Sequence, residues 1–166
     1  MEDKSGMSER ERVLASHSFL ADWARSFIKN KDIISKKIEQ IGNSRDGFDI
    51  YVKYRDRQQY FIIAPSIADM ESITQRVNNN SYCTIVTLNS RDNFNALIKS
   101  WPKLISFKFL NIIFVNPFSQ LDKKWIIFPH THHKVCDEAS LKNGLKSMFE
   151  MVEPIDEGQL VAKITS

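Results

Sequence analysis

The chain has 166 residues, of which 42% are hydrophobic and 26% are charged, with only five glycines and five prolines. These values are typical of a folded globular domain and exclude a low-complexity or disordered chain. The formal net charge of +3 permits a nucleic-acid partner without requiring one, and two cysteines are too few for a disulfide framework.

No segment predicts export or membrane insertion. The first residues are polar and lack the apolar core of a signal peptide, and no apolar run approaches the ~20 residues that span a bilayer. We therefore expect a cytoplasmic protein without a membrane partner. Its predicted parts are a disordered leader over 1–7, a single α/β domain over 8–153 and a C-terminal tail over 154–166.

Apolar periodicity predicts the elements in chain order. Ser8 and Glu11 fit a capping box that opens a long helix, and residues 30–32 are a candidate break in it. An apolar stripe of Ile34, Ile38 and Ile41 then continues to Gly42. The later predictions are strands at 47–55 and 58–64, a helix capped by Ser66, a strand at 82–88, a helix capped by Ser90 that Pro102 stops or kinks, strands at 110–115 and 125–128, and a last helix opened by Asp137.

The alternation of apolar strands with helices defines the expected architecture. Apolar strands separated by helices indicate a partly parallel sheet that is covered on both faces. The early hairpin makes the sheet mixed. We therefore expect an α/β fold with a mixed, partly parallel central sheet flanked by helices on both faces.

The segment 47–66 carries the most specific pattern. Gly47 and Asp49 enter a short strand, in which Asp49 is expected on the polar face, and an almost wholly apolar strand follows the turn. Over about residues 30–128, this order resembles the PD-(D/E)XK nuclease-like superfamily, which has a restriction-endonuclease-like core. The resemblance implies that Asp49 ligates a divalent metal and that Glu39 takes the place of an extra acid found in some members.

The second motif of that family, acid-x-Lys, is missing from the second strand. Ile63 and Pro65 stand at the closest register, and neither side chain binds a metal or polarises water. Phosphodiester hydrolysis needs a cation such as Mg²⁺, held by two or more oxygen ligands. An active variant therefore needs groups that have moved to neighbouring elements, and the candidates are Lys53, Asp69 and Glu71.

Three of the four histidines lie within residues 129–137. If this segment is extended, His130 and His132 share one face, and Cys136 is a third possible ligand for a transition metal, although no fourth is evident. A second interpretation is anion or ligand binding by these histidines with Lys134 beside a helix N-terminus. The third is an ordinary polar strand end before the last helix.

Three functions are compatible with this sequence. The first is a non-catalytic nuclease-like domain that binds DNA, RNA or a protein acting on nucleic acid. The second is an active variant Mg²⁺-dependent nuclease, and the third is a structural or oligomerisation protein; a homodimer is expected. The basic run 25–37 is alternatively the solvated face of a helix. The residues predicted to contact phosphate are Lys29, Lys36, Lys37, Arg45, Arg55 and Arg57.

Overall fold

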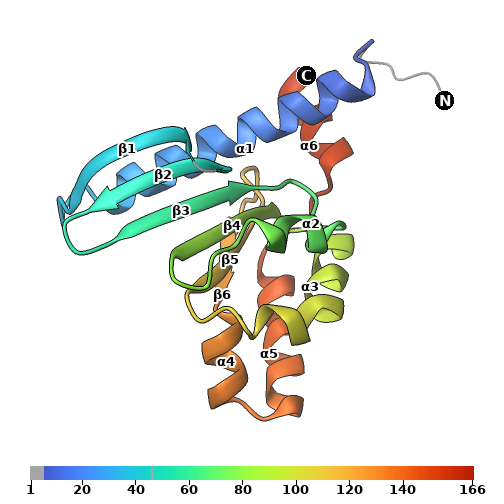
Figure 1. Cartoon of the computed structure of the whole chain (residues 1–166). Coiled ribbons are helices and arrows are strands. Elements are labelled where there is room, and N and C mark those ends of the chain that lie inside the picture. The colour runs from blue at the N-terminus through green and yellow to red at the C-terminus, as the bar shows by residue number, and fades with distance from the viewer. Residues whose placement is uncertain (1–5, 46) are drawn as a thin grey trace.

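The computed structural model describes residues 6–45 and 47–166. A six-stranded sheet crosses the molecule, and helices lie on both of its faces (Figure 1). The predicted α/β class with a mixed, partly parallel sheet is therefore confirmed. The strands, which lie in the sheet in chain order, are β1 (Ile38–Arg45), β2 (Phe48–Tyr54), β3 (Gln58–Ile63), β4 (Tyr82–Leu88), β5 (Leu110–Val115) and β6 (Lys124–Ile127).

Strand direction divides the sheet into an antiparallel and a parallel part. Strands β1, β2 and β3 form an antiparallel meander, β3, β4 and β5 run parallel, and β6 returns antiparallel to β5. A parallel connection needs a crossover, which a helix usually supplies. Here α2 (Met70–Gln75) connects β3 to β4, and α3 (Arg91–Leu104) connects β4 to β5.

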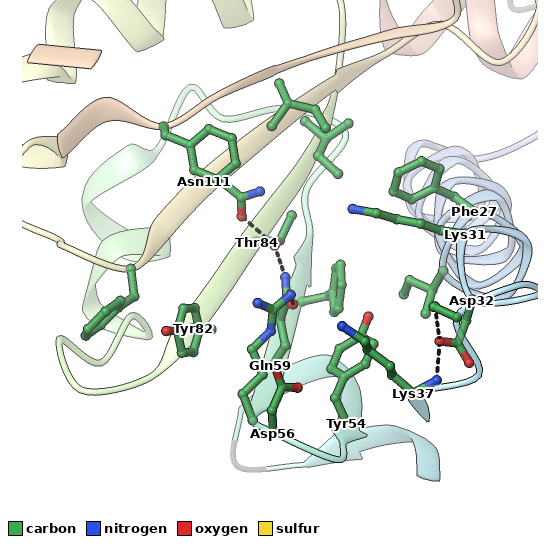
Figure 2. Close-up of a pocket in the computed structure, with 18 residues that line it drawn as sticks. Phe27, Lys31, Asp32, Lys37, Tyr54, Asp56, Gln59, Tyr82, Thr84 and Asn111 are labelled. Atoms are coloured by element: carbon green, nitrogen blue, oxygen red, sulfur yellow. Dashed lines mark hydrogen bonds between the residues drawn. The ribbon is translucent and has the colours of Figure 1, made fainter. Parts of the chain in front are cut away.

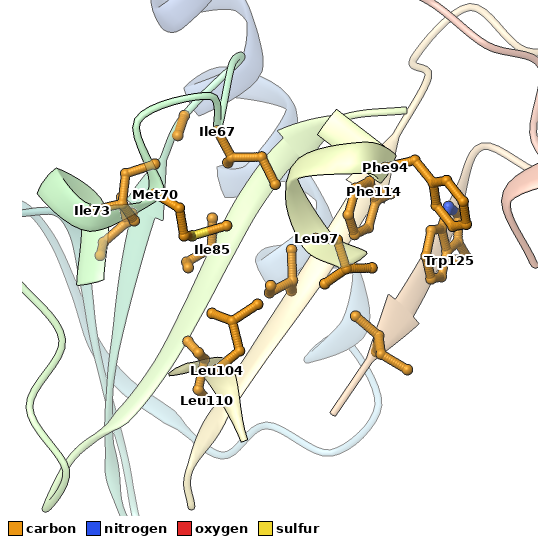
Figure 3. Close-up of a cluster of buried hydrophobic side chains, with 14 of the residues drawn as sticks. Ile67, Met70, Ile73, Ile85, Phe94, Leu97, Leu104, Leu110, Phe114 and Trp125 are labelled. Atoms are coloured by element: carbon orange, nitrogen blue, oxygen red, sulfur yellow. The ribbon is translucent and has the colours of Figure 1, made fainter. Parts of the chain in front are cut away.

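Each face of the sheet has its own apolar cluster. Helices α1 (Glu9–Lys31) and α6 (Glu157–Thr165) pack on one face, and α5 (Glu138–Met151) joins α2 and α3 on the other. The short α4 (Pro129–Val135) lies beside α5 (Figure 1). The cluster beneath α2, α3 and α5 (Figure 3) includes Met70, Ile85, Phe94, Leu97, Leu104, Phe114 and Trp125.

The central strands β4 and β5 are covered on both faces. Strands in this position need apolar side chains pointing both ways, so they occur in sequence as nearly continuous apolar runs. This is why the predicted strands 82–88 and 110–115 are confirmed residue for residue. Phe114 stacks on Trp125 of β6 with 4.4 Å between ring centroids, which extends the same cluster to the sheet edge.

The first helix ends at the candidate break, and the apolar stripe beyond it is a strand and not a helix. Helix α1 ends at Lys31, and the carboxylate of Asp32 accepts hydrogen bonds from the backbone N–H groups of Lys37 and Ile38, which turns the chain into β1. A register shift between Ile38 and Gln40 marks a β-bulge. The bulge lets Ile38 and Ile41 pack on the same cluster although they are three residues apart, and that spacing imitates a helix.

Two further helices differ from their predicted bounds. Helix α2 is capped by Asp69 and not by Ser66, because the carboxylate of Asp69 accepts from the N–H of Ser72. Helix α3 begins after Ser90, as predicted, but continues through Pro102 to Leu104. The last predicted helix, capped by Asp137, is confirmed as α5.

A leader and a tail were expected at the two ends of the chain. The expected leader, 1–7, lies mostly outside the residues that the structure describes. Residues 154–166, expected to be a tail, contain α6, which begins with a capping box of Asp156 and Gln159. Leu160 of α6 is fully buried in the cluster under α1, so this segment is part of the packed structure.

Buried asparagines close the carboxyl ends of the parallel strands. Asn89 follows β4 and is fully buried; its amide nitrogen donates to the carbonyls of Phe149 (3.2 Å) and Val152 (2.9 Å), and its carbonyl accepts from the indole of Trp125 (2.8 Å). These bonds attach the end of α5 to the sheet. Leaving a buried polar group without a hydrogen-bond partner costs free energy of folding. The carbonyls of Phe149 and Val152 and the indole of Trp125 are therefore held in place by their bonds to Asn89.

We expect Asn89→Ala to lower the free energy of unfolding by on the order of 3 kcal/mol, because it leaves buried partners unsatisfied. The matched control is Asn143→Ala, the same change at an exposed position of α5. Urea unfolding followed by circular dichroism measures both. Equal stability of the two variants would show that Asn89 does not hold α5 on the sheet.

Candidate functional site

Asp49 lies at the start of β2 and is half-buried. One carboxylate oxygen accepts from the backbone N–H of Ile63 at 2.8 Å, and the other accepts from Nε2 of His17 at 3.0 Å. The guanidinium of Arg76, at the end of α2, lies 4.0 Å from the first oxygen and also donates to the carbonyl of Gly47. Asp49 therefore connects α1, β3 and α2.

The carboxylate replaces a backbone acceptor where the β2–β3 ladder ends. The last pair in that ladder is Ile50 with Phe61, and the N–H of Ile63 bonds to Asp49 instead. Alternation breaks here, because Phe48 packs in one apolar cluster and Ile50 in the other. The expected alternation is therefore wrong at Phe48, while Ile50, Val52 and Tyr54 share one face as predicted and Lys53 is exposed.

The surroundings of Asp49 favour its charged form. Burial by itself raises the pKa of this carboxyl, but hydrogen bonds from His17 and Ile63 and the charges of His17 and Arg76 outweigh burial and hold the pKa below its ordinary value of 3.8. A lowered pKa means that the folded state is stabilised by the ionised group. That stabilisation is present above the unfolded pKa and is lost as pH falls through the folded pKa.

We expect Asp49→Ala to destabilise the fold by about 1–3 kcal/mol at neutral pH, because the N–H of Ile63 loses its acceptor. The difference from the wild type should shrink when the pH is lowered below 3.8, the ordinary value for the carboxyl. Urea unfolding over a pH series measures this. Asp122→Ala, at an exposed loop carboxylate, is the control, and equal losses in both variants would contradict the role given to Asp49.

The other predicted metal ligands are dispersed. Glu39 lies on β1 and not on a helix, and it pairs with Lys53 of β2 at 3.6 Å. Asp69 caps α2, and Glu71 is exposed in the first turn of that helix. Over residues 6–45 and 47–166, no three His, Cys, Asp or Glu side chains are grouped so that they could hold a metal ion.

The histidine segment is helical and not extended. It forms α4, in which Nδ1 of His132 lies 3.0 Å from the backbone nitrogen and 2.9 Å from the carbonyl oxygen of Phe128, so this ring contacts the first turn of its own helix. His130 hydrogen-bonds the carbonyl of Ile105 at 2.8 Å. The predicted pairing of His130 and His132 on one face depended on an extended backbone and is therefore wrong. Lys134 is exposed on the same helix.

Cys136 ends α4 and belongs to a second feature of the structure. With His133, Trp101 and Leu141 it lines an apolar cavity of about 310 Å³ between α3, α4 and α5. The indole of Trp101 donates to Nδ1 of His133 at 3.2 Å, which attaches α4 to α3. Cys136 therefore lies among apolar and structural groups, apart from His130 and His132.

A groove of about 550 Å³ opens on the α1 face of the sheet, over the amino ends of β3, β4 and β5 (Figure 2). One wall is the last turn of α1 and the following loop, with Phe27, Lys31 and Lys37. The β2–β3 hairpin contributes Tyr54 and Arg57. The opposite wall is aromatic and contains Tyr82, Phe109 and Phe128.

The walls combine aromatic rings with cations, and they also contain the carboxylates of Asp32 and Asp56 (Figure 2). The guanidinium of Arg57 lies 5.3 Å from the ring centroid of Tyr54 and 5.1 Å from that of Tyr82. The ammonium groups of Lys31 and Lys124 lie 6.0 Å and 5.2 Å from the ring centroid of Phe27. Such pairs place positive charge beside ring faces in a concave surface.

A row of polar side chains crosses the floor. The amide nitrogen of Gln59 on β3 donates to the hydroxyl of Thr84 on β4 at 2.6 Å, and this hydroxyl donates to the carbonyl of Asn111 on β5 at 2.5 Å. Further along the same face, these strands are apolar. The α1-facing residues that follow in the strands are Phe61 and Ile63, Val86 and Leu88, and Ile113 and Val115.

The groove gathers part of the predicted phosphate contacts. Lys37 and Arg57 line it, and Lys36 and Arg55 are exposed in the adjoining turns. Lys29 is exposed on α1 outside the groove lining, and the side chain of Arg45 lies outside the described part of the chain.

Sequence reasoning missed the aromatic walls and the polar floor. The available signal was a polar residue near the amino end of each of three apolar strands, namely Gln59, Thr84 and Asn111.

Comparison with protein-family models, with curated proteins and with solved structures finds no match to this chain. Within residues 6–45 and 47–166, no helix has the length and apolar character needed to cross a membrane.

Proposed function

We propose that this protein is a non-catalytic, nuclease-like domain that binds nucleic acid through the basic surface around the groove. The observation that carries the proposal is the local charge. Residues 29–37 and 54–57 hold six lysines and arginines against two aspartates, an excess larger than the net charge of +3 for the whole chain. All six cationic side chains are exposed. Such a surface attracts a phosphate backbone and releases its counterions.

The order of elements supports the nuclease-like part of the proposal. A long helix, a strand that Asp49 enters, a hairpin, a helix and a parallel strand are the features on which the resemblance to the PD-(D/E)XK superfamily rests. In the structure these are α1, β2, β3, α2 and β4, with the additional strand β1 between α1 and β2.

Three features support a binding role without catalysis. Both oxygens of Asp49 are engaged by Ile63 and His17, so the carboxylate serves the packing of the fold. Lys53 pairs with Glu39. The second strand presents Phe61 and Ile63 to the apolar cluster in place of metal ligands. Metal-assisted hydrolysis needs grouped oxygen ligands, and these side chains are used elsewhere.

We expect the wild-type protein to bind nucleic acid at low salt, with an affinity that falls steeply as salt is raised. Arg57→Glu should weaken binding by about tenfold and reduce the slope of log affinity against log salt by about 1 or more, because a phosphate contact is lost. Fluorescence anisotropy over a salt series, with both DNA and RNA, measures the affinity and the slope.

The control is Lys146→Glu on α5, which makes the same change in net charge on the opposite side of the sheet. It should leave the affinity within about twofold of the wild type. Absence of binding by the wild type at low salt, or equal losses in both variants, would refute the proposal.

The cytoplasmic location and the homodimer expected from the sequence belong to the same proposal. Both cysteines are free, with Cys83 buried, which is compatible with a cytoplasmic location. Burial raises the pKa of the Cys83 thiol to about 12, so this group is chemically quiet. The homodimer stays a prediction, and light scattering coupled to gel filtration would measure it.

A further inference from the structure

We propose that the groove is a base-binding site for single-stranded nucleic acid, in which one unstacked nucleotide lies between the aromatic walls and over the polar floor. This inference rests on the proposed function and deepens it, since it names the strand form that the basic surface takes. It rests on the groove's size, on its exposed rings, and on a floor that presents hydrogen-bond donors.

The size of the groove favours a single nucleotide over a duplex. Its volume of about 550 Å³ lies within the range of pockets that enclose small molecules. Bases in a duplex are stacked and paired, so their faces are covered and cannot enter a concave pocket. A single strand presents an exposed base face together with a charged phosphate, which is the combination that these walls complement.

Exposed rings supply the stacking surface. Tyr82, at the amino end of β4, is 40% exposed, and Phe128, which follows β6, is 45% exposed. Tyr82 is supported from behind by Phe109, with 4.8 Å between ring centroids, so its position is held before a ligand arrives. The guanidinium of Arg57 lies over the ring of Tyr82, 5.1 Å from its centroid, so a base that stacks on this face displaces Arg57 toward the phosphate of the same nucleotide.

The floor presents donors to the edge of the base. Thr84 uses its hydroxyl to accept from Gln59 and to donate to the carbonyl of Asn111. This direction of hydrogen bonds leaves the amide N–H groups of Asn111 for a ligand. Figure 2 shows the amide nitrogen of Asn111 on the groove side, with the ammonium group of Lys31 on the opposite wall.

Donors at the floor select for acceptors on the base. On their pairing edges, thymine and uracil present two carbonyl acceptors on either side of one N–H, whereas adenine presents one ring-nitrogen acceptor beside an amino donor. We therefore expect the groove to prefer thymine or uracil over adenine. Asn111 is the residue that sets this preference, since Lys31 and Arg57 carry charges suited to phosphate.

The experiment measures anisotropy of labelled oligonucleotides of about 12 nucleotides: oligo(dT), oligo(dA) and a duplex. The wild type should bind oligo(dT) at least about tenfold more tightly than the duplex. Tyr82→Ala should lose about tenfold in affinity for oligo(dT), while Tyr82→Phe keeps the ring and retains affinity. Asn111→Ala should reduce the ratio of dT to dA affinity, and Asn95→Ala, at an exposed position of α3, should not.

The outcomes separate this inference from the proposed function. If Arg57→Glu weakens binding but the duplex binds as tightly as oligo(dT) and Tyr82→Ala has no effect, the basic surface stands and the base site is refuted. If the wild type binds no nucleic acid, both fail. In a further arm, thymidine monophosphate competes with labelled oligo(dT). If the mononucleotide displaces oligo(dT) fully at an equal concentration, the ligand is a free nucleotide, and the proposal that the groove binds single-stranded nucleic acid is refuted. Circular dichroism and thermal unfolding of each variant verify that it is folded.

Discussion

The groove depends on one constraint, which is that a polar side chain on a sheet face can be covered by an apolar helix only if each of its polar atoms has a hydrogen-bond partner. On the α1 face, the amino ends of the parallel strands carry Gln59, Thr84 and Asn111, while the residues that follow them are apolar. Helices α1 and α6 pack over the apolar part. The polar part stays open, and the loop after α1 and the β2–β3 hairpin become its walls.

The opposite ends of the same strands are closed by protein groups. Open α/β sheets commonly bind ligands at the carboxyl ends of their strands. Here Asn89 joins β4 to the end of α5, and Asn93 accepts from the N–H of Ile67 while donating to the carbonyls of Pro65 and Leu88. Asp49 likewise uses its carboxylate to join α1 to β3. These polar groups stabilise the fold, and the exposed chemistry lies at the amino ends.

The pattern of apolar residues predicted the elements well where one regular pattern runs through the whole element. β4 and β5 were predicted with their observed bounds, because strands covered on both faces are continuously apolar. The pattern failed at Ile38 and Ile41, where a β-bulge puts residues three apart on one face. It failed again at residues 129–135, because short helices depend on tertiary contacts such as that of His130 with the carbonyl of Ile105.

The sequence by itself determined the α/β class, the apolar central strands, the caps of α1, α3 and α5, and the gathering of cations near residues 29–37 and 54–57. Only the tertiary structure decided which side chains meet. Gln59, Thr84 and Asn111 lie far apart in the chain and touch because the parallel register brings Phe61 opposite Thr84 and Thr84 opposite Asn111. That register arises from packing on both faces of the sheet, which no local pattern contains.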